Sequence, residues 1–193
     1  MTSGQAARLG EAFRLLQSGR ASEALAIAKS AAAAEPAAAD PQHMLALCHK
    51  ALGDEPSAVA AFDAALARAP RDPHLLGNYA NFLTRLRRYE EAIALYRRAI
   101  DLMPSHAEAW TNLGLTLLEL GDSAAAHASL ERAVSLRPNS ALAWQGLGQA
   151  RRAGRDLDGA EAALRKAVQI APGAGATWVN LGVVRRLLGD PAD

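Results

Sequence analysis

Proline recurs at a constant interval along this chain, and that interval limits the folds open to it. The prolines that keep a spacing of 34 residues are Pro36, Pro70, Pro104, Pro138 and Pro172. Three tryptophans keep the same spacing: Trp110, Trp144 and Trp178. A period of this length and strictness means that one supersecondary unit has been copied along the chain. The sequence therefore predicts an array of stacked units, in which the working surface is built from equivalent positions.

The proline register divides the chain into five complete units and part of a sixth. Placing each proline at position 32 of a unit gives the bounds 5–38, 39–72, 73–106, 107–140 and 141–174, followed by the partial unit 175–193. Positions 20 and 27 are then alanine in every complete unit, and position 8 is alanine or glycine throughout. Because proline alone set the register, this agreement tests it independently. We expect a single domain, 1–193, made of this array.

Each unit carries two helical stripes of apolar residues. In the fourth unit the i, i+3, i+4, i+7 spacing links Trp110, Leu113, Gly114 and Leu117, and a second stripe links Ala126, Leu130, Ala133 and Val134. Glycine at position 15 of four units can end the first helix in the left-handed conformation, and the proline stops the second. Arg87 and Arg155 take position 15 in the other two complete units. The pattern predicts an all-α fold of tandem helix–turn–helix units, an α-solenoid, with a helix A and a helix B in each unit.

Small and large residues alternate in a way that predicts how the helices pack. Alanine or glycine at positions 8, 20 and 27 would let helices A and B approach closely. The large residue at position 4 would fill the gap to the neighbouring helix. If Trp144 is fully enclosed there, truncation to alanine should cost about 3–5 kcal/mol.

These motifs resemble those of the tetratricopeptide repeat (TPR) family. In the fourth unit the resemblance lies in Trp110, Leu113, Gly114, Ala126, Leu130 and Pro138, and the fifth unit repeats it with Trp144, Leu147, Gly148, Ala160, Leu164 and Pro172. It covers residues 5–193. It implies a right-handed superhelix whose A helices line a concave groove, with positions 2, 5, 6, 9, 12 and 13 facing the groove. It also implies a protein–protein interaction scaffold that holds an extended peptide or a partner helix.

The groove positions contain a row of amide side chains. The row consists of Asn78, Asn81, Asn112, Gln145, Gln149 and Asn180. An amide offers two donors and an acceptor, so a spaced row can bind the backbone of an extended peptide whatever its sequence. The row is similar to the asparagine ladder of the repeat domain of O-linked N-acetylglucosamine transferase. Asparagine at position 6 is also common in the family generally, so a purely structural role stays open.

Paired arginines end helix A in the last two units. They are Arg151 with Arg152, and Arg185 with Arg186. One interpretation is a favourable interaction with the helix C-terminus. The other is an anion-recognising patch for an acidic peptide or a partner domain, in which Arg152 and Arg186 provide the charge selectivity. The basic clamp that chaperone-binding members of the family use is incomplete, because position 2 carries Asp40, His74, Glu108 and Leu142 in the second to fifth units.

The two ends of the array differ from its middle. The first unit has Arg8 and Glu11 where the pattern expects tryptophan and leucine, which is typical of a polar capping repeat. The sixth unit stops before its helix B, so we expect the chain to be the N-terminal part of a longer, bacterial protein. One alternative is a natural end covered by self-association through the exposed C-terminal edge, or a purely structural, self-associating scaffold. If the protein is longer, an alternative to the scaffold function is a substrate- or partner-recruiting segment of an enzyme of the glycosyltransferase, sulfotransferase or oxygenase type, with its catalytic domain beyond residue 193.

Composition and motifs argue against other classes of function. The formal charge is +1, which predicts no nucleic-acid partner, and Cys48 is the only cysteine. The five histidines lack the spacing of metal ligands on a helix, and no phosphate-binding or nucleophile motif occurs, so we expect no catalysis by this chain, no metal and no cofactor. The start lacks the apolar core of a secretory signal and there is no long apolar run, so we expect a cytoplasmic protein that does not bind a membrane.

Overall fold

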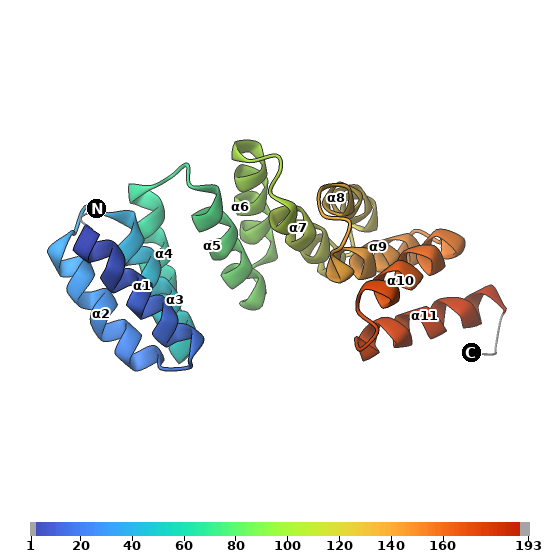
Figure 1. Cartoon of the computed structure of the whole chain (residues 1–193). Coiled ribbons are helices and arrows are strands. Elements are labelled where there is room, and N and C mark those ends of the chain that lie inside the picture. The colour runs from blue at the N-terminus through green and yellow to red at the C-terminus, as the bar shows by residue number, and fades with distance from the viewer. Residues whose placement is uncertain (1–2, 190–193) are drawn as a thin grey trace. The chain divides into compact units, whose positions relative to one another are not determined.

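The computed structural model describes residues 3–189 and confirms the all-α prediction (Figure 1). The described part of the chain holds eleven α-helices and no strand. In chain order they are α1 Ser3–Gln17, α2 Ala21–Ala34, α3 Ala39–Leu52, α4 Glu55–Arg68, α5 Pro73–Arg85, α6 Tyr89–Leu102, α7 Ala107–Glu119, α8 Ser123–Leu136, α9 Ala141–Ala153, α10 Leu157–Ile170 and α11 Gly175–Leu188. Odd-numbered helices are the A helices of the predicted units and even-numbered helices are the B helices.

The chain divides into two compact units at Phe82, within α5. In the first unit, α1 packs on α2, α2 on α3, and α3 on α4. In the second unit, each helix from α6 to α10 packs on the next one along the chain. Consecutive A helices also contact one another within a unit, as α1 with α3, α7 with α9, and α9 with α11. The A helices of each unit therefore form a shared surface. The prediction of one array over 1–193 stays a prediction.

The turn between helices A and B uses the left-handed conformation in every unit. Position 15 has a positive φ whether it is glycine, as at Gly53 (76°), or arginine, as at Arg87 (60°) and Arg155 (66°). Gly154, one residue earlier, has a φ of −78° and does not take this role. The backbone of Arg155 therefore adopts a conformation that is unfavourable for any residue with a Cβ.

Small residues build the contact between helices A and B, as predicted. The alanines at positions 20 and 27 are fully buried in all five complete units: Ala24, Ala31, Ala58, Ala65, Ala92, Ala99, Ala126, Ala133, Ala160 and Ala167. At position 8, a Cβ added to Gly114 would lie 2.5 Å from Cγ of Leu130, and one added to Gly148 would lie 2.6 Å from Cγ of Leu164. Glycine there is required because the leucine of helix B occupies the space.

The tryptophans at position 4 are less enclosed than the packing pattern suggested. Trp110 and Trp144 are half-buried and Trp178 is 50% exposed. Their indole N–H groups donate to the carbonyl oxygen of the proline six residues earlier, at 2.8 Å for Trp144 to Pro138 and for Trp178 to Pro172. The shared period of proline and tryptophan thus reflects a hydrogen bond that ties α7, α9 and α11 to the end of the preceding helix B.

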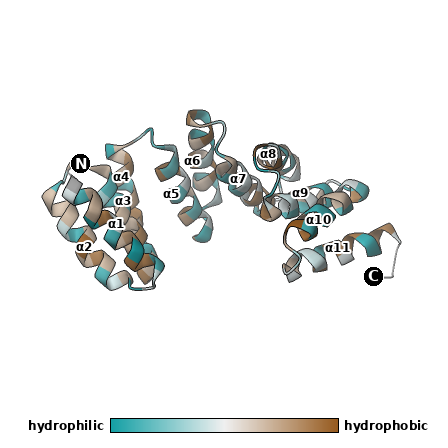
Figure 2. Ribbon diagram, viewed as in Figure 1, coloured by the Kyte–Doolittle hydropathy of each residue, from teal (hydrophilic) through white to brown (hydrophobic). Residues whose placement is uncertain are grey.

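Polar and apolar residues alternate along every helix of the chain (Figure 2). In α1, Arg8 and Glu11 are exposed while Leu9 and Ala12 are buried, which fits the predicted polar capping repeat. Among the described residues, no helix is both long and apolar enough to span a bilayer.

Candidate functional site

The predicted amide row lies on the A helices, with members in both compact units. Asn78 and Asn81 lie on α5 in the first unit. In the second unit, Asn112 lies on α7, Gln145 and Gln149 on α9, and Asn180 on α11. All six side chains are half-buried. The second-unit members lie on A helices that contact one another, and we call them the amide surface: Asn112, Gln145, Gln149 and Asn180.

In the first unit, Asn78 already has a partner within the protein. Its Nδ2 lies 3.1 Å from Nε2 of His43 on α3. Burial lowers the pKa of His43, so the ring is neutral at neutral pH and Nε2 can accept from the amide. This bond links α5 to α3, the helix A of the previous repeat. Asn78 therefore has a structural role, one of the two roles that the sequence left open.

The amide surface of the second unit retains unused hydrogen-bonding capacity. Gln145 accepts through Oε1 from the hydroxyl of Thr177 at 3.0 Å. No hydrogen-bond partner for the side chains of Gln149 and Asn180 is found in the part of the chain that the structure describes. These groups lie on helices, so their direction is set by the backbone, and they can still donate to and accept from a ligand.

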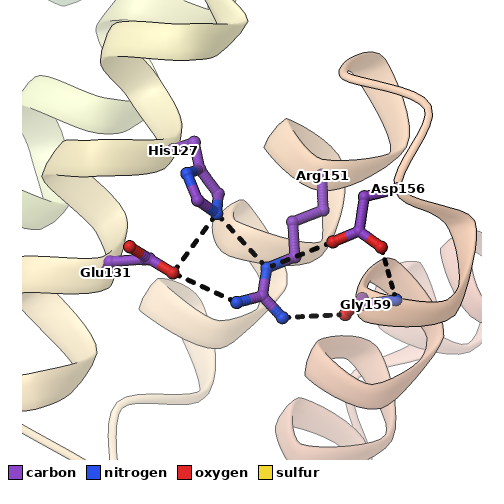
Figure 3. A network of polar contacts seen from close by, with 5 residues as sticks. All are labelled: His127, Glu131, Arg151, Asp156 and Gly159. Atoms are coloured by element: carbon purple, nitrogen blue, oxygen red, sulfur yellow. Dashed lines mark hydrogen bonds and ion pairs between the residues drawn. The ribbon is translucent and has the colours of Figure 1, made fainter.

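The structure separates the two members of each arginine pair. Figure 3 shows the guanidinium of Arg151 between α8 and the start of α10. It donates to Glu131 at 3.2 Å, to the carbonyl oxygen of Gly159 at 3.3 Å and to Nε2 of His127 at 3.4 Å. Its Nε also lies 3.8 Å from the carboxylate of Asp156. Arg151 is therefore a clamp between successive repeats.

Arg185 repeats the same arrangement one unit later. Its Nε lies 3.2 Å from Glu161 on α10, and that carboxylate also pairs with Arg165 at 3.0 Å. Position 11 is leucine in three of the earlier units, so arginine there replaces an apolar contact by an ion pair to the preceding helix B. By contrast, Arg152 and Arg186 are exposed, and neither has an ion-pair partner among the described residues.

A cleft at the end of α9 was not foreseen from the sequence. It has a volume of about 630 Å³ and is lined by Arg152, Ala153, Arg155, Leu157 and Leu187. The one signal that pointed to it was arginine at position 15 of the fifth unit, where four other units have glycine. Its side chains come from three segments, so periodicity within one helix could not reveal it.

Cys48 is fully buried, and burial raises the pKa of its thiol to about 11, so it is protonated at neutral pH. Within residues 3–189, no three histidine, cysteine or acidic side chains lie close enough together to hold a metal ion.

Comparison with known proteins identifies the repeats. Tetratricopeptide repeat models match residues 15–81, 73–139 and 111–175. The type IV pilus assembly protein PilF of Pseudomonas aeruginosa is 31% identical over 116 residues, which are 58% of this chain and 45% of PilF. The match thus spans less than half of the length of that relative.

Solved structures share the fold at lower sequence identity. A structure of Pseudomonas aeruginosa PilF superposes with a TM-score of 0.88 at 23% identity, over 96% of this chain and 85% of PilF. The pilus biogenesis factor PilW gives a TM-score of 0.88 at 20% identity, over 98% and 88% of the two chains. MamA of Desulfovibrio magneticus gives 0.77 at 22% identity, over 90% and 98%. With three family matches that together span most of its length, and with helix pairs in the predicted register, the chain belongs to the tetratricopeptide repeat family.

Proposed function

We propose that the chain is a protein–protein interaction scaffold that holds an extended peptide segment of a partner on the amide surface of its second unit. The family membership supports an interaction role. The observation that carries the finer proposal is the pair Gln149 and Asn180, which are half-buried and have no side-chain partner in the described chain. A hydrogen bond from a ligand to such a group is favourable, because partial burial has already removed some of the water that would otherwise hydrate the group.

An extended peptide fits the spacing of these groups better than a small molecule does. Each amide can accept from a backbone N–H and donate to a backbone carbonyl. The groups lie on three successive A helices that contact one another, so a strand-like segment can meet them in turn. In the first unit, Asn81 and the oxygen of Asn78 provide a second, separate set of contacts. Arg152 and Arg186 add selectivity for acidic partners.

The test is a triple variant, Asn112→Ala/Gln149→Ala/Asn180→Ala, probed against an array of peptides. We expect the variant to lose binding across peptides of different sequence, because backbone contacts are shared by all of them. Asn139→Ala, an exposed amide in the loop between α8 and α9, is the matched control. Unchanged binding by the triple variant would remove the amide surface from the proposal.

The match to PilF favours a narrower second role, in the assembly of a bacterial surface machine such as a type IV pilus. Deleting the gene in its host and examining the cells for pili by electron microscopy tests this role, and normal piliation would reject it. Fractionation of the unmodified host, in which the protein is present, tests the cytoplasmic location.

We further propose that the chain itself is not catalytic and takes no cofactor, nucleic acid or membrane as partner. The alternative is that the chain is a recruiting segment of a larger enzyme. The reading frame after residue 193 tests this alternative, and a catalytic domain encoded there would favour it over the scaffold proposal.

Self-association through α11 is a separate proposal. Trp178 and Val179 are 50% and 67% exposed, and an added Cβ at Gly182 would meet nothing within 4 Å. Light scattering over a range of concentrations tests it, and a constant monomer mass would exclude it.

A further inference from the structure

The cleft at the end of α9 combines positive charge with apolar walls. Arg152 and Ala153 belong to the last turn of α9, Arg155 to the following turn, Leu157 to the start of α10 and Leu187 to the last turn of α11. Leu187, on the last described helix, is 56% exposed. The volume of about 630 Å³ lies in the range of clefts that bind ligands.

The arginines of the cleft differ from their neighbours in having no carboxylate partner. Arg151 and Arg185 are engaged with Glu131 and Glu161, whereas Arg152 and Arg155 are exposed and without an ion pair among the described residues. Asp156 accepts from the backbone N–H of Gly159 at 2.9 Å and faces Arg151, so Asp158 is the remaining carboxylate at this end of α10.

Arg155 also occupies its position at a conformational disadvantage. Its φ is 66°, in the left-handed region; glycine occupies four of the equivalent turns, as Gly19, Gly53, Gly121 and Gly189, and Arg87, with a φ of 60°, occupies the fifth. A residue with a Cβ is disfavoured in that region. The fold does not need this side chain, because glycine makes the same turn elsewhere in the chain. A guanidinium held at the mouth of a cleft in spite of that disadvantage points to a role outside folding.

We propose that this cleft binds an acidic segment of a partner protein, in which a leucine-sized side chain lies between carboxylates. The guanidinium groups of Arg152 and Arg155 bind the carboxylates, since the planar fork matches their geometry. Leu157 and Leu187 cover the apolar side chain. The proposal rests on the proposed function in one respect, that the partner is a protein. The cleft contains none of the amides, and Arg152 is the one residue that the two proposals share.

The charge of the whole molecule favours a peptide over other anionic partners. The chain has a formal charge of only +1, so no extended basic field draws it to nucleic acid or to an anionic membrane. The two arginines act instead over the few ångströms of the cleft, and its leucine walls require an apolar group beside the negative charge.

The experiment measures fluorescence anisotropy with a labelled peptide, GDLELDG, and with its uncharged counterpart, GNLQLNG. We expect the acidic peptide to bind about tenfold more tightly, as two charge-assisted contacts imply. Raising the ionic strength from about 0.01 M to about 1 M, which shortens the Debye length from about 30 Å to about 3 Å, should abolish most of that difference. Equal affinity for the two peptides, or no binding of either, would overturn the proposal.

Variants separate binding from folding. Arg155→Gly removes the guanidinium and also relieves the unfavourable φ, so we expect a protein of equal or higher thermal stability that binds the acidic peptide about fivefold more weakly. Arg152→Gln should weaken binding by a similar factor. Arg132→Gln, which removes an exposed arginine on α8, is the matched control and should leave the affinity unchanged. Full affinity in Arg155→Gly would overturn the assignment of that residue.

Two further measurements distinguish this proposal from its alternatives. The amide triple variant should bind GDLELDG normally, because it keeps both arginines of the cleft. If it also loses binding to the arrayed peptides, both proposals are supported. If the amide variant fails to bind arrayed peptides while the arginine variants keep wild-type affinity for GDLELDG, the proposed function stands and the cleft does not. Binding to phosphatidylserine vesicles that is lost in the arginine variants, without peptide binding, would replace the acidic peptide by a lipid surface.

Discussion

A single methyl group at position 8 provides the sharpest test of how the repeats pack. In the fifth repeat, a Cβ on Gly148 would lie 2.6 Å from Cγ of Leu164 and 3.2 Å from the carbonyl oxygen of Ala160. Leu164 is 1% exposed and has no room to withdraw. In α11, the equivalent Gly182 meets nothing within 4 Å. The variants Gly148→Ala and Gly182→Ala therefore add the same atom at the same register position, with and without an opposing helix.

The expected free energies follow from two opposing effects. Alanine is favoured over glycine inside a helix by about 1 kcal/mol, and this gain applies to both variants. Overpacking a dense core costs about 1–3 kcal/mol, and this applies only to Gly148→Ala. We expect Gly148→Ala to lower the free energy of unfolding by about 1 kcal/mol, and Gly182→Ala to raise the local stability of α11 by about 1 kcal/mol.

Urea unfolding followed by far-ultraviolet circular dichroism measures the free energy of unfolding of Gly148→Ala. Amide hydrogen exchange in α11 measures the local stability of Gly182→Ala. The second repeat suggests a rescue, because it pairs alanine at position 8 with a planar ring at position 24, as Ala46 and Phe62. Gly148→Ala/Leu164→Phe should recover part of the loss, which a double-mutant cycle would report as a coupling energy. If Gly148→Ala were more stable than wild type, the steric explanation of the glycine would be refuted.

Three further predictions concern single side chains. Trp144→Phe removes the 2.8 Å hydrogen bond to Pro138 but keeps most of the ring, so thermal unfolding should show a loss of about 0.5–1.5 kcal/mol, and no loss would mean that the bond contributes nothing. Arg151→Leu restores the residue found at this position as Leu117, so its stability should stay within about 1 kcal/mol of wild type in urea unfolding, and a loss well above that would make the ion-pair network essential. Burial raises the pKa of the Cys48 thiol to about 11 from an ordinary value of about 8.5. Folding therefore favours the protonated thiol, and this contribution is present below about pH 8.5 and lost as the pH rises toward 11. A thiol reagent should label Cys48 only under unfolding conditions, and rapid labelling of the native protein would contradict its burial.

Most of the local architecture could be predicted because it depends on spacing along one chain. Position 20 and position 27 had to be small in every copy of the unit, and the structure buries all ten of those alanines completely. The expectation for tryptophan was less accurate, since an interval of 34 residues shows that a side chain is required but does not show why. The indole is retained for its bond to the proline carbonyl as well as for its area, and half of Trp178 stays exposed.

The candidate site followed a different logic. Periodicity identified the amide row residue by residue, but it could not distinguish Asn78, which is bonded to His43, from Gln149, which has no partner in the described chain. It also grouped Arg151 with Arg152, although they point to different surroundings. Adjacent residues on a helix are separated by about 100° around the axis, so one of the pair meets α8 while the other reaches solvent.

The sequence by itself determined the helices, the register and the small residues at their contact, because these depend on a period repeated five times. Only the tertiary structure decided which polar groups are already satisfied, and where two arginines without a described carboxylate partner lie beside the half-buried Leu157 and the exposed Leu187. Those properties depend on segments that are distant along the chain, such as α9 and α11, and no spacing within one repeat encodes the distance between them.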